Sequence, residues 1–184
     1  MSKTQATKDL EKQIYSATKK QGIFGCYEVT IGWFGSERVD YITYDTKGVW
    51  RCYEVKVSLS DFRSKAKNTF VGHYNYYVLT KELYEKVKHE IPSHIGAYVE
   101  GTNVKRAKKQ DLKVEQDVLK NSLIRSLSRE AEKLYRNNDP RLGDQMKRRY
   151  DQEKKQKEKY RVELYNLRRT QQRRTDLKCI VGED

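Results

Sequence analysis

The chain has 184 residues, 35% of them charged and 36% hydrophobic, so it has room for one modest core and must leave part of its length solvated. Residues 102–184 carry 24 Lys and Arg against 14 Asp and Glu, whereas residues 1–101 carry 15 against 12. This surplus, +13 over the whole chain, favours a polyanion such as DNA as the partner. With no long apolar run and no recognisable signal peptide, the sequence excludes a membrane protein and predicts a soluble, cytoplasmic one.

Apolar residues have helical spacing at the start of the chain and the alternating spacing of strands after Gly22. Residues 4–20 place Leu10 and Ile14 on one face of a predicted helix, and alternation from Ile23 to Trp33 predicts a half-buried strand. Residues 38–44 and 48–57 are two further strand-like runs. The short turn between them, rich in Asp and Gly, indicates a β-hairpin.

The pattern then alternates between helix and strand. Ser58 is a candidate cap for a helix through Asn68, and residues 74–80, 81–89 and 95–100 predict a strand, a helix and a strand. Helices interleaved with strands indicate an α/β fold, with a mixed β-sheet flanked by helices.

Beyond residue 110 the strand patterns stop and two helical stretches follow. The first carries a Leu-rich face and ends near Pro140; the second, residues 144–174, is dominated by Lys, Arg, Gln and Glu. Its apolar stripe is too sparse for a bundle helix that is stable alone. We therefore predict a core over residues 1–110 and a basic α-helical C-terminal extension over residues 111–184.

The predicted hairpin brings together three side chains suited to metal-dependent chemistry. If facing positions in the hairpin sum to about 94, Asp40 lies opposite Glu54, and Lys56 joins the same face. Two neighbouring carboxylates suit Mg²⁺ or Mn²⁺, which polarise a phosphodiester and activate water. Lys56 would hold or deprotonate that water, or stabilise charge on the phosphate. The alternative interpretation is a cross-strand ion pair on a solvated face.

Asp40, followed after a hairpin by Glu54-Val55-Lys56, resembles the D...(D/E)-X-K signature of the PD-(D/E)XK nuclease superfamily, with Val39 in place of the nominal Pro. Residues 10–110 are similar to the MmcB-type DNA-repair nucleases in five stretches: Arg38-Val-Asp40, Glu54-Val-Lys-Val-Ser58, Asp61-Phe62, Lys65-Ala-Lys67 and Tyr74-Asn-Tyr-Tyr-Val-Leu79. The resemblance implies a restriction-endonuclease-like core, a divalent metal, and DNA cleavage or repair.

One ligand of the expected metal site stays open. We expect the ion to contact Asp40, Glu54 and the backbone carbonyl of Val55. A further carboxylate often comes from the first helix in this superfamily, which would be Glu11, but Glu28 on the first strand competes for the role.

Basic side chains in two parts of the chain are candidate nucleic-acid contacts: Arg63, Lys65, Lys67, Arg168, Arg169, Arg173 and Arg174. The sequence thus predicts a metal-dependent DNA endonuclease that acts in repair or recombination. The alternative is a catalytically silent nuclease fold that binds nucleic acid or a protein through its basic helices. Pairing of those helices into a homo-oligomer is also open.

Overall fold

The computed structural model describes residues 3–35, 37–64, 68–138 and 140–181, and their side chains except at residues 140–142, 146 and 170–181. The chain divides into two units, residues 1–130 and 131–184. We expected the core to end near residue 110. The first unit extends further because Leu119 and Leu123, from a later helix, are buried in its hydrophobic core.

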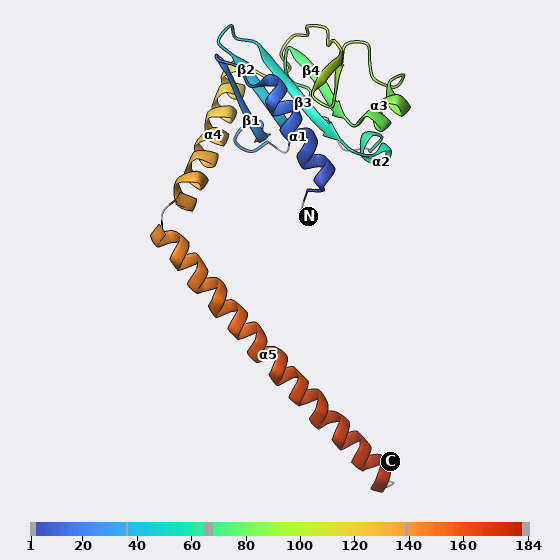
Figure 1. The fold of residues 1–184 in the computed structure, drawn as a ribbon, viewed down its shortest axis with the longest axis vertical. Coiled ribbons are helices and arrows are strands. Elements are labelled where there is room, and N and C mark those ends of the chain that lie inside the picture. Colours follow the sequence, from blue (N-terminus) through green and yellow to red (C-terminus); the bar gives the residue numbers. More distant parts are fainter. Residues whose placement is uncertain (1–2, 36, 65–67, 139, 182–184) are drawn as a thin grey trace. The chain divides into compact units, whose positions relative to one another are not determined.

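The first unit is an α/β fold built on a six-stranded mixed sheet (Figure 1). The strands follow chain order across the sheet: β1 (Ile23–Thr30), β2 (Arg38–Asp45), β3 (Trp50–Lys56), β4 (Tyr74–Leu79), β5 (Gly96–Val99) and β6 (Thr102–Lys105). The first three strands are antiparallel, β4 and β5 continue parallel to β3, and β6 is antiparallel to β5. The two parallel connections contain the short helices α2 (Leu59–Phe62) and α3 (Lys81–Val87).

Two of these elements differ from the sequence-based prediction. Strand β6 was not predicted; it follows a two-residue turn at Glu100 and Gly101, whose φ angles of 50° and 80° suit a tight hairpin. Helix α2 ends at Phe62, well before Asn68, and part of the predicted second turn falls on residues 65–67, outside the described part of the chain.

Helix α1 (Gln5–Thr18) covers one face of the sheet through Leu10 and Ile14. On this face, tyrosines from five adjacent strands form a row with ring centroids 4.5–5.5 Å apart: Tyr27, Tyr41, Tyr53, Tyr76 and Tyr98. Cross-strand aromatic contacts of this kind stabilise a sheet beyond simple burial. Tyr76 and Tyr77 of β4 are therefore buried core residues.

Helices α3 and α4 (Gln116–Asn138) pack on the opposite face. Leu119 and Leu123 of α4 lie against Ile42 and Cys52 in one cluster, and α3 packs against β4 and β5 in another. Side chains of β3 alternate between the faces, so Glu54 and Lys56 share the Cys52 side of the strand. The carboxylate of Glu54 and the ammonium group of Lys56 thus lie on the face of the sheet that carries the α4 cluster and the α3 cluster.

The second unit contains the end of α4 and the long helix α5 (Pro140–Val181). Its described apolar side chains are exposed, among them Tyr150, Tyr160, Leu164 and Leu167. They form the sparse apolar stripe from which we predicted that this helix would not be stable alone as a bundle helix. None of the helices formed by the described residues has the length and apolar character needed to cross a membrane.

Candidate active site

The β2–β3 hairpin has the register expected from its turn. Tyr41 pairs with Tyr53 and Tyr44 with Trp50, so Asp40 stands one residue beyond the last backbone pair, opposite Glu54. Beyond the Tyr41–Tyr53 pair, the Asp40 side chain connects the two strands, because its Oδ2 accepts a 2.9 Å hydrogen bond from the N–H of Val55.

Glu54 and Lys56 are held on β3 by the parallel neighbour β4, where they pair with Tyr77 and Leu79. Although both carry ionisable groups, Glu54 is only 4% exposed and Lys56 only 7%. One oxygen of the Glu54 carboxylate accepts a hydrogen bond from the buried N–H of Thr69, at 3.3 Å. Buried ionisable groups are costly unless they are paired, which makes this position unusual within the sheet.

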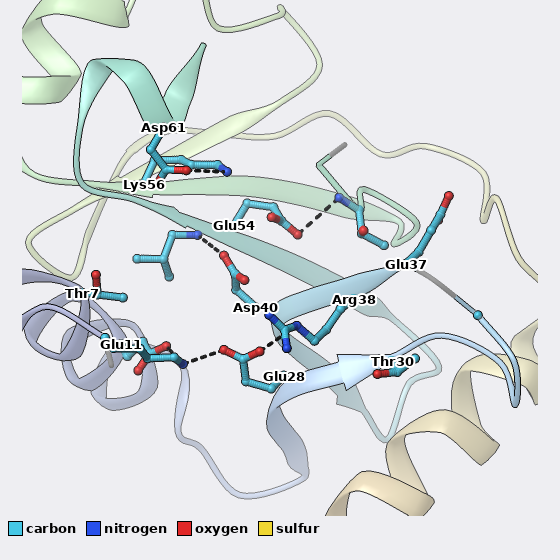
Figure 2. A pocket seen from close by; sticks show the side chains of 14 residues that line it. Thr7, Glu11, Glu28, Thr30, Glu37, Arg38, Asp40, Glu54, Lys56 and Asp61 are labelled. Carbon is cyan, nitrogen blue, oxygen red and sulfur yellow. Dashed lines mark hydrogen bonds and ion pairs between the residues drawn. The ribbon is translucent and has the colours of Figure 1, made fainter. Parts of the chain in front are cut away.

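The three motif residues line one pocket of about 700 Å³ (Figure 2). The open alternatives of the sequence analysis, Glu11 from α1 and Glu28 from β1, both line it as well. The remaining walls are Lys3, Thr7, Thr30, Gly35, Glu37, Arg38, Val55, Asp61 and Thr69. The pocket therefore gathers carboxylates from α1, β1, β2 and β3 together with the side chain of Lys56.

The carboxylates perturb one another. Burial, followed by the negative charge of Asp40, raises the pKa of Glu54 to about 8, against the opposing effects of Lys56 and the Thr69 N–H. Burial also raises the pKa of Asp40, and Glu28 adds to the effect, while the hydrogen bond from Val55 lowers it. At neutral pH Glu54 is therefore mostly protonated.

Lys56 faces a further acidic residue at the start of α2. Its Nζ lies 3.4 Å from Oδ1 of Asp61, whose own N–H is capped by the Ser58 hydroxyl at 3.1 Å. Ser58 thus serves as the helix cap that the sequence predicts. Asp61 lines the pocket and helps to orient the ammonium group of Lys56.

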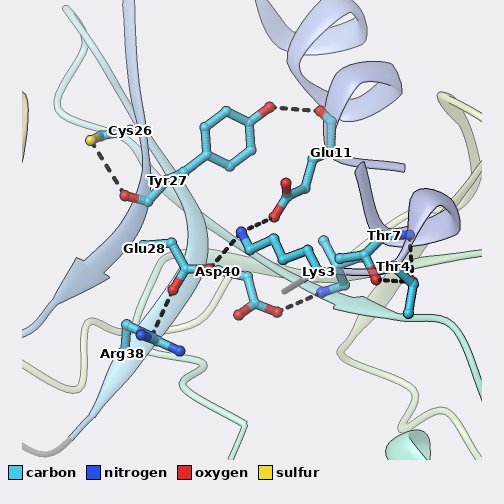
Figure 3. A network of polar contacts seen from close by, with 10 residues as sticks. Lys3, Thr4, Thr7, Glu11, Cys26, Tyr27, Glu28, Arg38 and Asp40 are labelled. Atoms are coloured by element: carbon cyan, nitrogen blue, oxygen red, sulfur yellow. Dashed lines mark hydrogen bonds and ion pairs between the residues drawn. The ribbon is translucent and has the colours of Figure 1, made fainter. Parts of the chain in front are cut away.

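Lys3 enters the pocket from the segment before α1 and contacts both competing glutamates (Figure 3). Its Nζ pairs with Glu11 and lies 2.6 Å from Oε1 of Glu28, whose other oxygen lies 2.8 Å from Nε of Arg38. Burial lowers the pKa of this ammonium, but the hydrogen bonds that Lys3 donates to Glu11 and Glu28 prevail and raise it. Glu11 and Glu28 are therefore neutralised by the protein's own cations.

Glu28 has a backbone conformation that L-residues rarely adopt, with a φ of 53° within β1. On its two sides the strand changes face: Tyr27 packs on the α1 side, whereas Val29 joins the α4 side. The strict alternation that we predicted through Glu28 is wrong at this residue. The departure directs the Glu28 carboxylate into the pocket.

Among the pocket residues that the sequence did not indicate, Lys3 and Thr69 contact its carboxylates directly. Nothing in the pattern around them marks a site: Lys3 precedes the first helix, and Thr69 contributes mainly its backbone N–H. In the described part of the chain, no group of three or more His, Cys, Asp or Glu side chains has the arrangement of a metal site. Within the pocket, the charge of Asp40 is the largest effect after burial that raises the pKa of Glu54.

None of the predicted nucleic-acid contacts whose side chains are described lines the pocket. Arg63 forms an ion pair with Glu90, through a 3.0 Å bond from its Nε, and does not line the pocket. Arg168 and Arg169 are exposed on α5. Lys65 and Lys67, and the side chains of Arg173 and Arg174, lie outside the described residues.

Comparison with known proteins identifies a fold and no family. No family model matches the chain, and no curated protein matches its sequence. A solved structure, the SPO1766 protein of unknown function from Silicibacter pomeroyi, is similar with a TM-score of 0.59 at 19% identity. The similarity covers 76% of this chain and 96% of that one. The likeness is one of fold, a mixed sheet flanked by helices.

Proposed function

We propose that this protein is a metal-dependent DNA endonuclease of the PD-(D/E)XK type, acting in DNA repair or recombination. The observation that carries the proposal is that Asp40, Glu54 and Lys56 line one pocket, with the pKa of Glu54 raised to about 8. Perturbed pKa values in a concave site are typical of catalytic groups. The mixed sheet, with the hairpin at its centre and α1 on one face, is compatible with a restriction-endonuclease-like core.

The donor set fits a hard divalent cation. Burial raises the pKa of both carboxyl groups, and the charge of Asp40 further opposes the ionisation of Glu54, so a cation would relieve both effects. The residues that would hold Mg²⁺ or Mn²⁺ are Asp40, Glu54 and the carbonyl of Val55. Bound there, such an ion would polarise a phosphodiester and lower the pKa of a water molecule.

The protein's own groups have separate tasks around that centre. The Thr69 N–H fixes one oxygen of Glu54, and the Val55 N–H fixes one oxygen of Asp40, so both carboxylates are oriented in advance. Lys56, held by Asp61, supplies positive charge where a phosphate would gain negative charge, or orients the attacking water. Glu11 and Glu28 remain alternatives for an additional ligand, and both would first have to release Lys3.

DNA is the proposed target because the chemistry of the pocket suits a phosphodiester and the chain as a whole is strongly basic. Its net charge is +13, and α5 exposes Arg168 and Arg169. Each phosphate contact made by such side chains releases counterions and adds affinity that falls with salt.

The proposal is tested by cleavage of supercoiled, mismatched and branched DNA in Mg²⁺ or Mn²⁺. Asp40→Asn, Glu54→Gln and Lys56→Met should each reduce the rate at least about 100-fold, because the first two remove an expected metal ligand and the third removes positive charge beside the reacting phosphate. Glu85→Gln and Lys88→Met are matched controls from an exposed ion pair outside the pocket and should cleave at the wild-type rate. Cleavage that persists in all three pocket variants would refute the nuclease proposal.

One observation favours a second candidate, a catalytically silent nucleic-acid-binding or protein-binding module. Because Lys3 already neutralises Glu11 and Glu28, the pocket has an internal cation that can replace a metal at part of the site. For such a module we expect salt-sensitive DNA binding, with no cleavage and no heat of Mn²⁺ binding in calorimetry. Light scattering of the full chain would show whether its exposed helix α5 pairs copies into a homo-oligomer.

A further inference from the structure

The connection between β1 and β2 presents two aromatic side chains to solvent beside the pocket. Trp33 is 77% exposed and Phe34 is fully exposed. Thr30, which precedes them, and Gly35, which follows them, both line the pocket that contains Asp40. Large aromatic side chains exposed side by side next to a polar pocket mark an interaction surface.

Helix α4 anchors the β1–β2 loop through hydrogen bonds. The Gly32 N–H donates to the Ser122 hydroxyl at 2.9 Å, and Arg125 donates to the carbonyls of Thr30 and Gly32 at 2.7 and 2.8 Å. The Arg125 guanidinium also lies over the Trp33 ring, 5.2 Å from its centroid. Three hydrogen bonds with the buried Ser122 and with Arg125, both on α4, therefore fix the base of the loop.

The backbone of the loop depends on its two glycines. Gly32 has a φ of 75°, which other residues rarely adopt, and a Cβ at Gly35 would lie 1.8 Å from the carbonyl oxygen of Ile31. The Ile31 N–H closes the loop on the carbonyl of Glu37 at 2.9 Å. This tight, glycine-dependent turn keeps the two aromatic rings out of the core, so their exposure is built into the fold.

We propose that Trp33 and Phe34 stack on an unpaired nucleobase while the adjoining phosphodiester lies in the pocket. The inference rests on the proposed nuclease function and names its substrate class: single-stranded, gapped or mismatched DNA. An intact duplex already stacks its own bases, so a flat side chain reaches the face of a base only where pairing is interrupted. The rings offer π faces, and Arg125 adds positive charge behind one of them.

The chain provides an internal optical reporter for this contact. It has two tryptophans, and Trp50 is completely buried, so a ligand that stacks on the surface changes the emission of Trp33 alone. Titration of the full-length protein in EDTA, where a metal-dependent enzyme does not cleave, should give quenching with an oligothymidine strand and with a gapped duplex. An intact duplex of the same length should give little quenching.

Substitutions then separate stacking from other roles. Trp33→Ala and Phe34→Ala should each weaken binding of the oligothymidine strand by about five- to 150-fold, whereas Trp33→Phe should bind normally and lose the fluorescence change. Phe24→Ala is the matched control, because Phe24 is an exposed aromatic on β1, the strand before this loop, and lies outside the pocket. It should leave the affinity unchanged.

Each outcome bears on one proposal. DNA binding with unchanged Trp33 emission, or with unchanged affinity in both alanine variants, overturns the stacking role even if wild-type protein cleaves DNA in Mn²⁺. That result would leave the aromatic pair as a contact for a protein or another surface. Quenching by unpaired DNA with no cleavage under any metal supports the stacking role and overturns the nuclease proposal.

Discussion

Glu54 offers the sharpest physical test of the pocket, because its carboxyl group should make the folded protein less stable as pH rises. The ordinary pKa of this side chain is 4.5, and the folded protein raises it to about 8. The folded state therefore keeps a proton that the unfolded chain releases above pH 4.5. Stability from this group is complete below that pH and is lost as pH rises through about 8.

The size of the effect follows from the two pKa values. At about 1.4 kcal/mol per pH unit, Glu54 should cost about 3 kcal/mol in free energy of unfolding between pH 5 and pH 8. Small domains have only about 5–15 kcal/mol in total, so this loss is measurable. Glu54→Gln keeps the size of the side chain and an acceptor for the Thr69 N–H, and it removes the titration.

Urea unfolding in EDTA, followed by circular dichroism at pH 5 to 9, measures this difference. The Gln variant should exceed the wild type by little at pH 5 and by about 3 kcal/mol at pH 8. Glu85→Gln, in an exposed pair with Lys88, should follow the wild type at a constant offset over this range. Parallel wild-type and Glu54→Gln curves would mean that Glu54 is already ionised, and the electrostatic basis of the site would be refuted.

Three further predictions follow from individual contacts. Lys3→Met should tighten Mn²⁺ binding severalfold in calorimetry, because Lys3 competes with a cation for Glu11 and Glu28; unchanged affinity would contradict that competition. Gly96→Ala should destabilise the protein by about 1–3 kcal/mol in urea unfolding, since its Cβ would lie 2.4 Å from the Tyr76 ring. Joint replacement of Arg168 and Arg169 by Gln should reduce the salt dependence of DNA binding, measured by anisotropy, by about 0.7–0.9 in log–log slope per lost phosphate contact. An unchanged slope would place the phosphate contacts elsewhere.

The central hairpin could be predicted because its geometry is set by local chemistry. Asp45 accepts hydrogen bonds from two backbone N–H groups of the turn, at 3.0 Å each, and Gly48 takes a φ of 82° there. Such a turn fixes the register of both strands, so the approach of Asp40 to Glu54 follows from residues within 15 positions of one another. The number of the first five strands and their positions along the chain follow in the same way, from local alternation.

The surroundings of the hairpin could not be predicted, because they depend on contacts across long sequence separations. Ser122 and Arg125 reach the β1–β2 loop from 90 or more positions away, and no local pattern in α4 indicates which loop it will hold. For the same reason the boundary expected near residue 110 differs from that of the first unit. The Leu-rich face of α4 shows that the helix will be buried somewhere, but it does not identify the strands that receive it.

Backbone strain and unfavourable ionisation meet in the same pocket, and this coincidence is the best physical argument that the pocket serves a function. Among the described residues, the non-glycine positions with positive φ are Glu28 and Glu100. Glu100 occupies a tight hairpin turn that requires this conformation, whereas Glu28 lies within a strand, where an ordinary φ would preserve the alternation. Strain of this kind costs about 1–3 kcal/mol, and the raised pKa of Glu54 adds a second cost beside it. A pocket selected for stability alone would have neither, so both costs are better explained by carboxylates that are held in place to bind a cation.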